Sequence, residues 1–287
     1  MVTASRPQSF AQALHIRSEA RVIPLAGGTD LMVKHRRPFG LAPEFAHPIL
    51  FLGHLPELRH ISTDGKALVI GSGVTFSDLL AHEQVPGALK QSVADIASPA
   101  IRNVATLGGN ICNASPAGDT LPALYGLDAT LVLARVGGER WVGIERFILG
   151  PGKTDLRDDE LLQAVILPLE HFDLAFFRKV GTRKANALSK ISFLGLGRID
   201  GGQISDLRVA FGAVAPTVVR SRGLESGCVR LDRAGLIARL PRLLEEYARL
   251  IVPIDDQRST AEYRMAVSLR FLARFLAEVA TEAKHFG

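Results

Sequence analysis

Two glycine-containing segments carry the residue types in this chain that are best suited to chemistry. The first is Pro-Leu-Ala-Gly-Gly-Thr-Asp at residues 24–30, and the second is a longer small-residue stretch at residues 104–128. Glycine has no Cβ atom, so the main chain can approach a ligand closely at such positions. In the second segment the small residues alternate with polar ones, including Thr106, Asn110 and Asp119. We therefore expect free backbone N–H groups and polar side chains that together receive a polar or anionic group.

The first segment lies between a strand candidate at residues 22–25 and a helix candidate at residues 29–37. A strand, a glycine turn and a helix N-terminus present unpaired N–H groups to a phosphate. An ordinary tight turn before a Thr-Asp helix cap explains the same residues, and the spacing differs from the dinucleotide and P-loop fingerprints. In the second segment, residues 121–127 predict a short helix for which Asp119 could be the N-cap.

Composition excludes several classes of protein. The chain has 287 residues, of which 47% are hydrophobic, so it can bury a sizeable core and form two domains. Two cysteines are too few for a disulfide framework, an iron–sulfur cluster or a structural zinc site, and the eight histidines show no pair at ligand spacing. We predict no metal site. The net charge of +5 comes with only 6% aromatic residues, which does not indicate a nucleic-acid-binding face.

Neither a membrane span nor a secretory signal is predicted. No apolar run approaches the ~20 residues that cross a bilayer, and the N-terminal sequence has no continuous apolar segment. We therefore expect a soluble protein in the cytoplasm.

Periodicity predicts an α+β chain. In the N-terminal part we expect helices at 7–20, 75–81 and 87–97, strands at 22–25 and 49–52, and hairpins at 58–71 and 129–142. Residues 160–169 should form either a strand pair or one long strand. In the C-terminal part we expect strands at 175–180, 191–199 and 207–214, and helices at 234–250 and 259–283, the last with a Ser259 and Glu262 capping box. The alternation of apolar residues 207, 209, 211 and 213 against Arg208 and Gly212 indicates one buried face of the sheet.

Together the two glycine segments resemble the FAD-binding (medium) subunit of the molybdenum hydroxylase family, the xanthine dehydrogenase and carbon monoxide dehydrogenase type. The resemblance continues through Gly-Pro-Gly-Lys-Thr at 150–154, Phe-Arg-Lys at 177–179 and Ser-Thr-Ala-Glu-Tyr-Arg at 259–264. It implies a two-subdomain FAD-binding domain of the vanillyl-alcohol-oxidase/PCMH-like type at residues 1–170, divided near residue 55. A C-terminal antiparallel sheet with helices would follow at residues 174–287.

The resemblance also implies which residues contact FAD. The diphosphate would lie against both glycine segments, Asp119 would accept hydrogen bonds from cofactor hydroxyls, and Leu162 would line the flavin; core packing is the alternative for Leu162. The cofactor-binding residues implied are Pro24, Leu25, Ala26, Gly27, Gly28, Thr29, Asp30, Leu31, Thr106, Gly108, Gly109, Asn110, Ser115, Asp119, Leu162 and Lys179.

No residue indicates a general base or nucleophile, so we expect no catalytic side chain in this chain. The resemblance implies electron transfer in a heterotrimer with a molybdopterin-binding large subunit and a two-cluster iron–sulfur small subunit. FAD would pass electrons to NAD or another acceptor. The alternative is a stand-alone flavin-dependent oxidoreductase. A subunit of the same architecture without cofactor is disfavoured by the presence of both glycine pairs and Asp119.

Overall fold

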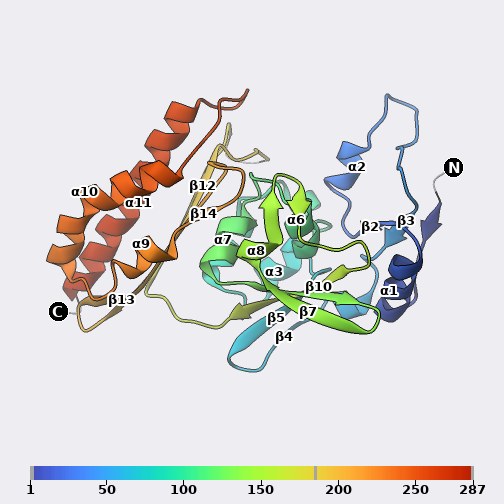
Figure 1. The fold of residues 1–287 in the computed structure, drawn as a ribbon, viewed down its shortest axis with the longest axis horizontal. Coiled ribbons are helices and arrows are strands. Elements are labelled where there is room, and N and C mark those ends of the chain that lie inside the picture. The colour runs from blue at the N-terminus through green and yellow to red at the C-terminus, as the bar shows by residue number, and fades with distance from the viewer. Residues whose placement is uncertain (1–2, 184–185, 286–287) are drawn as a thin grey trace. The chain divides into compact units, whose positions relative to one another are not determined.

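A small parallel sheet opens the fold in the computed structural model, which describes residues 3–183 and 186–285 (Figure 1). Its strand order is β1-β3-β2. Phe10 and Ala13 pack the first helix against Leu50 of this sheet. The elements are β1 Ala4–Ser5, α1 Phe10–Glu19, β2 Ile23–Leu25, α2 Leu31–Lys34 and β3 Ile49–Phe51.

The helix predicted at residues 29–37 is wrong in extent, because only Leu31–Lys34 is helical. None of these four residues is buried. Most helical stability comes from packing an apolar face, so a helix without one does not extend.

A five-stranded antiparallel sheet follows, with strand order β4-β5-β10-β6-β7. The central strand β10 pairs on both sides, since Val165 lies opposite Ile70 of β5 and Leu131 of β6. The two predicted hairpins are confirmed as the β4–β5 and β6–β7 pairs, although residues 58–60 lie outside the first one. The strands are β4 Ile61–Thr63, β5 Ala67–Gly71, β6 Thr130–Arg135, β7 Gly138–Gly143 and β10 Leu161–Pro168, and a 3-10 turn, Pro56–Leu58, precedes them.

Short helices and one further strand pair accompany this sheet. Thr75 and Asp78 form the capping box of α3, each side chain accepting the other residue's N–H, which confirms the predicted helix start. Helix α5, just before the second glycine segment, and helix α6, within that segment, were not predicted. The elements are α3 Phe76–Ala81, α5 Pro99–Arg102, α6 Leu107–Asn113, α8 Ile144–Phe147, β8 Ile148–Gly150 and β9 Lys153–Thr154.

The C-terminal sheet is antiparallel, with strand order β11-β12-β13-β14. Two long helices, α10 and α11, cover one of its faces (Figure 1). On that face Phe193 lies 6.0 Å from Phe275 and 5.0 Å from Phe211, measured between ring centroids. The elements are β11 Leu174–Val180, β12 Ile191–Asp200, β13 Gln203–Gly212, β14 Val219–Arg220, α9 Arg222–Ser226, α10 Arg233–Leu250 and α11 Ala261–His285.

The other face of this sheet is also covered, so the prediction of one buried face is wrong. Helix α7 (Thr120–Gly126) packs there, and a Cβ atom on Gly126 would lie 2.4 Å from Leu194. A Cβ atom on Gly212 would lie 2.9 Å from Pro122 of the same helix. Arg208, predicted on the open side, is consequently 7% exposed. Helix α4 (Gly87–Ala94) packs against α7 and β11.

The start of α11 differs in detail from the prediction. Thr260 Oγ1, not Ser259, accepts the Tyr263 N–H at 3.2 Å, and Asp255 accepts the Ala261 N–H at 2.5 Å. Ser259 pairs instead with the backbone of Asp256. The capping side chain thus lies one residue later than expected.

The described chain divides into two compact units that interleave in sequence. The first comprises the chain up to Val85, Ala97–Ser115 and Asp128–Leu169, and the second comprises Pro86–Ile96, Pro116–Leu127 and the chain from Glu170. The division at residues 170–174 stays a prediction. No helix within the described ranges is long and apolar enough to cross a membrane.

Candidate functional site

The first glycine segment carries a run of unpaired main-chain donors. It leaves β2 after Leu25, and Gly28 takes a φ of +71°, a conformation that favours glycine. The N–H groups of residues 27–31 have no acceptor among the described residues, and the next amide, that of Met32, bonds back to Gly28 O at 2.9 Å. Five successive free amides form a site suited to an anion. This confirms the expectation of free N–H groups in the first segment.

The second segment is different, because its amides are already bonded. Helix α6 begins after Thr106, whose Oγ1 accepts the Gly109 N–H at 3.1 Å. The N–H groups of Leu107 and Gly108 donate to the carbonyls of Val74 and Ser72, and that of Asn110 donates to Thr106 O. The expectation of free N–H groups at residues 107–110 is therefore wrong. This part of the segment can contact a ligand only through its side chains and through the open surface at Gly109.

The glycines of the two segments have distinct neighbours. A Cβ atom on Gly27 would lie 2.1 Å from Val104 O, and one on Gly108 would lie 2.6 Å from Ser72 Cβ. These two glycines allow one stretch of main chain to touch another. Gly109 is exposed, and a Cβ atom there would meet only Thr106 Oγ1 at 3.0 Å. Gly109 is thus the position of the second segment where the absence of a side chain leaves open surface.

A cavity of about 600 Å³ brings the two segments together within the first unit. Four of the predicted site residues line it: Leu25, Ala26, Gly27 and Thr106. Arg6 and Arg59 also line the cavity and supply positive charge. The lining residues that were not predicted from the sequence are Arg6, Phe51, Gly53, His54, Arg59, Gly73, Thr75, Asn103 and Val104. Arg59 forms one long ion pair with Asp78, 3.9 Å between nitrogen and oxygen, and both side chains are about half exposed. The free amide of Gly27 and the two guanidinium groups favour an anionic ligand here.

Side chains also connect the two segments. Asn113 at the end of α6 donates from Nδ2 to Asp30 Oδ2 at 2.8 Å, and Lys34 Nζ donates to Asn113 Oδ1 at 2.5 Å. Asp30 was predicted as a cofactor contact, and the structure gives its carboxylate this linking role. The loop between β2 and α2 is thereby held beside α6.

Asp119 and Lys179 meet in the second unit. Lys179 Nζ lies 2.6 Å from Asp119 Oδ2, and Ser189 Oγ donates to Oδ1. Burial raises the pKa of the Asp119 carboxyl group, although Lys179 and Ser189 favour its ionised form. Asp119 occupies the N-cap position of α7, as the alternative reading predicted, but its side chain makes no cap hydrogen bond to the helix. Ser189 was not predicted, because nothing in the sequence around it distinguishes it.

The remaining predicted residues lie in the first unit without lining the cavity. Leu162 is 5% exposed in β10, where it pairs with Leu133. Ser115 is partly buried and follows α6. Cys112 is half-buried in α6, and burial raises the pKa of its thiol to about 12. The described residues contain no cluster of side chains able to hold a metal ion.

Comparison with known proteins places this chain in a family. The model of the FAD binding domain in molybdopterin dehydrogenase matches residues 1–170, and that of the CO dehydrogenase flavoprotein C-terminal domain matches residues 176–279. The chain is 34% identical to the xanthine dehydrogenase FAD-binding subunit of Escherichia coli O157:H7, covering 97% of this chain and 96% of that one. It is 27% identical to the carbon monoxide dehydrogenase medium chain of Hydrogenophaga pseudoflava, covering 94% of each.

Solved structures share the fold. Reconstituted CO dehydrogenase from Oligotropha carboxidovorans contains a chain that superposes with a TM-score of 0.87 at 22% identity, covering 98% of both chains. The match extends over both the N-terminal sheets and the C-terminal sheet with its helices, which confirms the predicted α+β fold class. The chain therefore belongs to the FAD-binding medium subunits of the molybdopterin dehydrogenases, the family of the xanthine and carbon monoxide dehydrogenases.

Proposed function

We propose that this chain is the electron-transfer subunit of a molybdenum hydroxylase complex and that its own residues bind FAD at the sites predicted above. The observation that carries the proposal is the run of five free amides at residues 27–31, close in sequence to the cavity-lining residues 25–27. A diphosphate needs several donors and positive charge, and the first segment supplies donors that the protein itself leaves unused.

The side chains have distinct proposed roles. The amides of residues 27–31 bind the diphosphate, and Thr106 closes the cavity from α6. Asp119 accepts a hydrogen bond from a cofactor hydroxyl, with Lys179 holding the carboxylate in place. Leu162 supplies an apolar contact for the flavin. Bound FAD supplies the exchange between one-electron and two-electron transfer.

The family supports a proposal for the partners and the electron path. We propose a cytoplasmic heterotrimer in which a two-cluster iron–sulfur subunit delivers electrons to this chain and a molybdopterin-binding subunit oxidises the substrate. Relatives are named as subunits or medium chains of enzymes for xanthine, glyceraldehyde and carbon monoxide. Such different substrates on one type of flavin chain support substrate choice in another subunit. NAD or another acceptor receives the electrons.

The first test is the visible absorption spectrum of the purified chain, followed by titration with FAD if the chain is colourless. Flavin bands, present or recovered with one FAD per chain, support the cofactor site. A folded chain that binds no FAD alone or with its iron–sulfur partner contradicts it. Anaerobic reduction of the FAD-loaded chain by NADH then tests the acceptor, since rapid loss of flavin colour with NADH supports NAD.

A further inference from the structure

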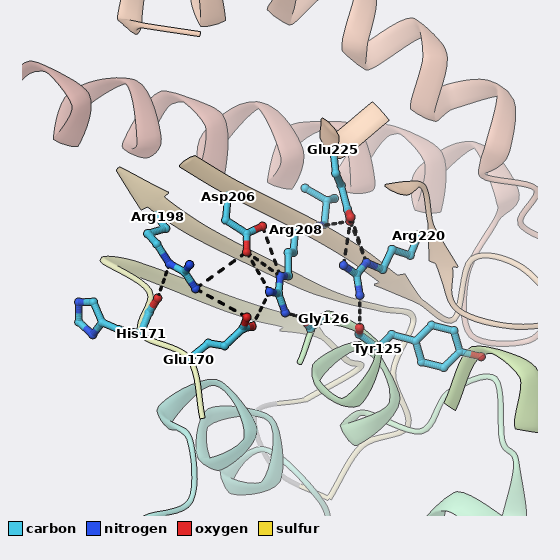
Figure 2. Close-up of polar contacts among 10 residues, drawn as sticks. Tyr125, Gly126, Glu170, His171, Arg198, Asp206, Arg208, Arg220 and Glu225 are labelled. Atoms are coloured by element: carbon cyan, nitrogen blue, oxygen red, sulfur yellow. Dashed lines mark hydrogen bonds and ion pairs between the residues drawn. The ribbon is translucent and has the colours of Figure 1, made fainter. Parts of the chain in front are cut away.

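Two buried arginines of the C-terminal sheet hold the end of α7. Arg208 Nη1 on β13 donates to Gly126 O at 3.1 Å, and Arg220 Nη1 on β14 donates to Tyr125 O (Figure 2). Their side chains are only 8% and 4% exposed. The last carbonyls of a helix have no partner within the helix and carry its negative dipole end. A guanidinium group satisfies both needs at once.

The Arg208 guanidinium is fixed by neighbours on the same face. Its Nη2 lies 2.8 Å from Asp206 Oδ2 and also pairs with Glu170. The guanidinium carbon lies 4.8 Å from the ring centroid of Phe172. A buried charge with two carboxylates and an aromatic face around it has little freedom to reorient, so the direction of its bond to α7 is defined.

Arg220 is fixed in the same manner by one carboxylate. Its Nε lies 3.0 Å from Glu225 Oε1 and 3.1 Å from Oε2 (Figure 2). Glu225 also accepts the Val209 N–H at 2.8 Å, which connects the pair to the strand that carries Arg208. The two arginines therefore belong to one polar layer on this face of the sheet.

The opposite end of α7 carries Asp119. Its two carboxylate oxygens accept from Lys179 and Ser189, also residues of the second unit. Helix α7 also lies directly on the sheet, since a Cβ atom on Gly126 would lie 2.4 Å from Leu194 and one on Gly212 would lie 2.9 Å from Pro122. These contacts restrain the seven-residue helix at both ends and along its length, so its C-terminal bonds help to determine where Asp119 lies.

We infer that Arg208 and Arg220 are positioning residues for the cofactor. They act through α7 to hold the Asp119 carboxylate where it accepts the cofactor hydroxyl. This inference rests on the proposed role of Asp119 in binding FAD. In this inference the arginines do not contact FAD themselves. Replacing them weakens FAD binding only as far as it displaces Asp119.

The test is a double-mutant cycle on the full-length chain. Arg208→Lys and Arg220→Lys keep the positive charge beside the carboxylates but lose the planar fork. FAD affinity is measured for each variant, for Asp119→Asn, and for each pair. Arg198→Lys is the matched control, because Arg198 lies in the same layer, 4.0 Å from Asp206, and has no bond to α7 among the described residues. Hydrogen exchange of a peptide covering residues 119–127 is followed without FAD.

We expect each lysine variant to weaken FAD binding roughly tenfold, and to do so less than about twofold in the Asp119→Asn background. Exchange in α7 should accelerate by roughly tenfold in the same variants and remain unchanged in Arg198→Lys. Equal losses in both backgrounds, or unchanged exchange in α7, would overturn the inference. If the wild-type chain binds no FAD, the proposed function fails separately, and unchanged exchange would still refute the hold on α7.

Discussion

The two glycine segments have similar compositions but use their main chains in opposite ways. Residues 27–31 leave five amides without an acceptor in the described part of the chain, whereas the amides of residues 107–110 all bond within the protein. Gly28 allows a positive φ angle, and Gly108 allows two stretches of main chain to come into contact. A run of glycines and polar residues therefore does not by itself identify a ligand cradle. The deciding feature is where the N–H groups go.

The largest expected effect is at a glycine that lies against another stretch of main chain. In Gly27→Ala the new Cβ atom would lie 2.1 Å from Val104 O, which is main chain and cannot rotate away. We expect a loss of stability on the order of 3 kcal/mol and a Tm lower by roughly 5–10 °C, measured by calorimetry. Gly138→Ala, where no atom lies within 4 Å of the new Cβ, is the control and should leave the Tm nearly unchanged. Equal Tm values for the two variants would contradict the tight approach.

The carboxylate at the end of the second segment gives the next largest effect. Asp119→Asn removes the charge that we propose accepts a cofactor hydroxyl, and FAD affinity should fall about 10- to 100-fold. Titration by flavin fluorescence measures this, with Asp200→Asn at the exposed end of β12 as the control. An unchanged affinity in Asp119→Asn would remove Asp119 from the site.

The raised pKa of Asp119 gives this comparison a pH dependence. Its native pKa lies above the ordinary value near 3.9, so its contribution to folding is full below about pH 3.9 and is lost as pH rises through the native pKa. FAD binding should follow the opposite direction, because the ionised carboxylate is the better acceptor. We expect wild-type affinity to fall as pH is lowered through the native pKa of Asp119, and this component to be absent in Asp119→Asn. An identical pH profile in both proteins would contradict the assignment.

Hydrogen exchange distinguishes the two sets of amides directly. Without FAD, residues 27–31 should exchange quickly and residues 107–110 slowly, since only the latter are hydrogen-bonded. Adding FAD should slow the first set by about tenfold or more and leave the second set nearly unchanged. Slow exchange at 27–31 in the FAD-free chain would show that another acceptor already occupies those amides.

The smallest expected effect on stability is at Gly109. Alanine is a better helix former than glycine, and its Cβ atom would crowd only Thr106 Oγ1. We expect Gly109→Ala to change the free energy of unfolding by less than about 0.5 kcal/mol. Gly109→Leu should then reveal whether a ligand covers this exposed position. Loss of FAD binding at an unchanged Tm would assign Gly109 to the site, and full binding would leave it outside.

Local patterns predicted the elements that depend on local forces. The hairpins around Gly65 and Gly137 and the capped start of α3 are present where periodicity and turn residues indicated them. The long C-terminal helices are also present, because each has an extended apolar stripe. Helix α6 was missed because two glycines and two asparagines lower helix propensity. Its first turn is stabilised instead by the distant carbonyls of Ser72 and Val74.

The candidate site was predicted in part for a related reason. Leu25, Ala26, Gly27 and Thr106 were named and line one cavity, and Asp119 and Lys179 were named and form a buried pair. Arg6 and Ser189 were missed, because their roles depend on residues far away in the sequence. The burial of Arg208 was likewise invisible, since alternation along one strand does not show what covers its second face.

The interleaving of the two units has a consequence for how the chain is made. Helix α7 leaves the ribosome well before its partners, since Arg208 follows Gly126 by 82 residues and Arg220 follows Tyr125 by 95. Seven residues do not form a stable helix alone. During synthesis the segment from Pro116 to Leu127 can pack only on the earlier helix α4, and the face that packs on β12 and β13 stays uncovered until those strands have been translated. A nascent or truncated chain ending near residue 170 would contain both glycine segments in full and still lack a correctly placed Asp119.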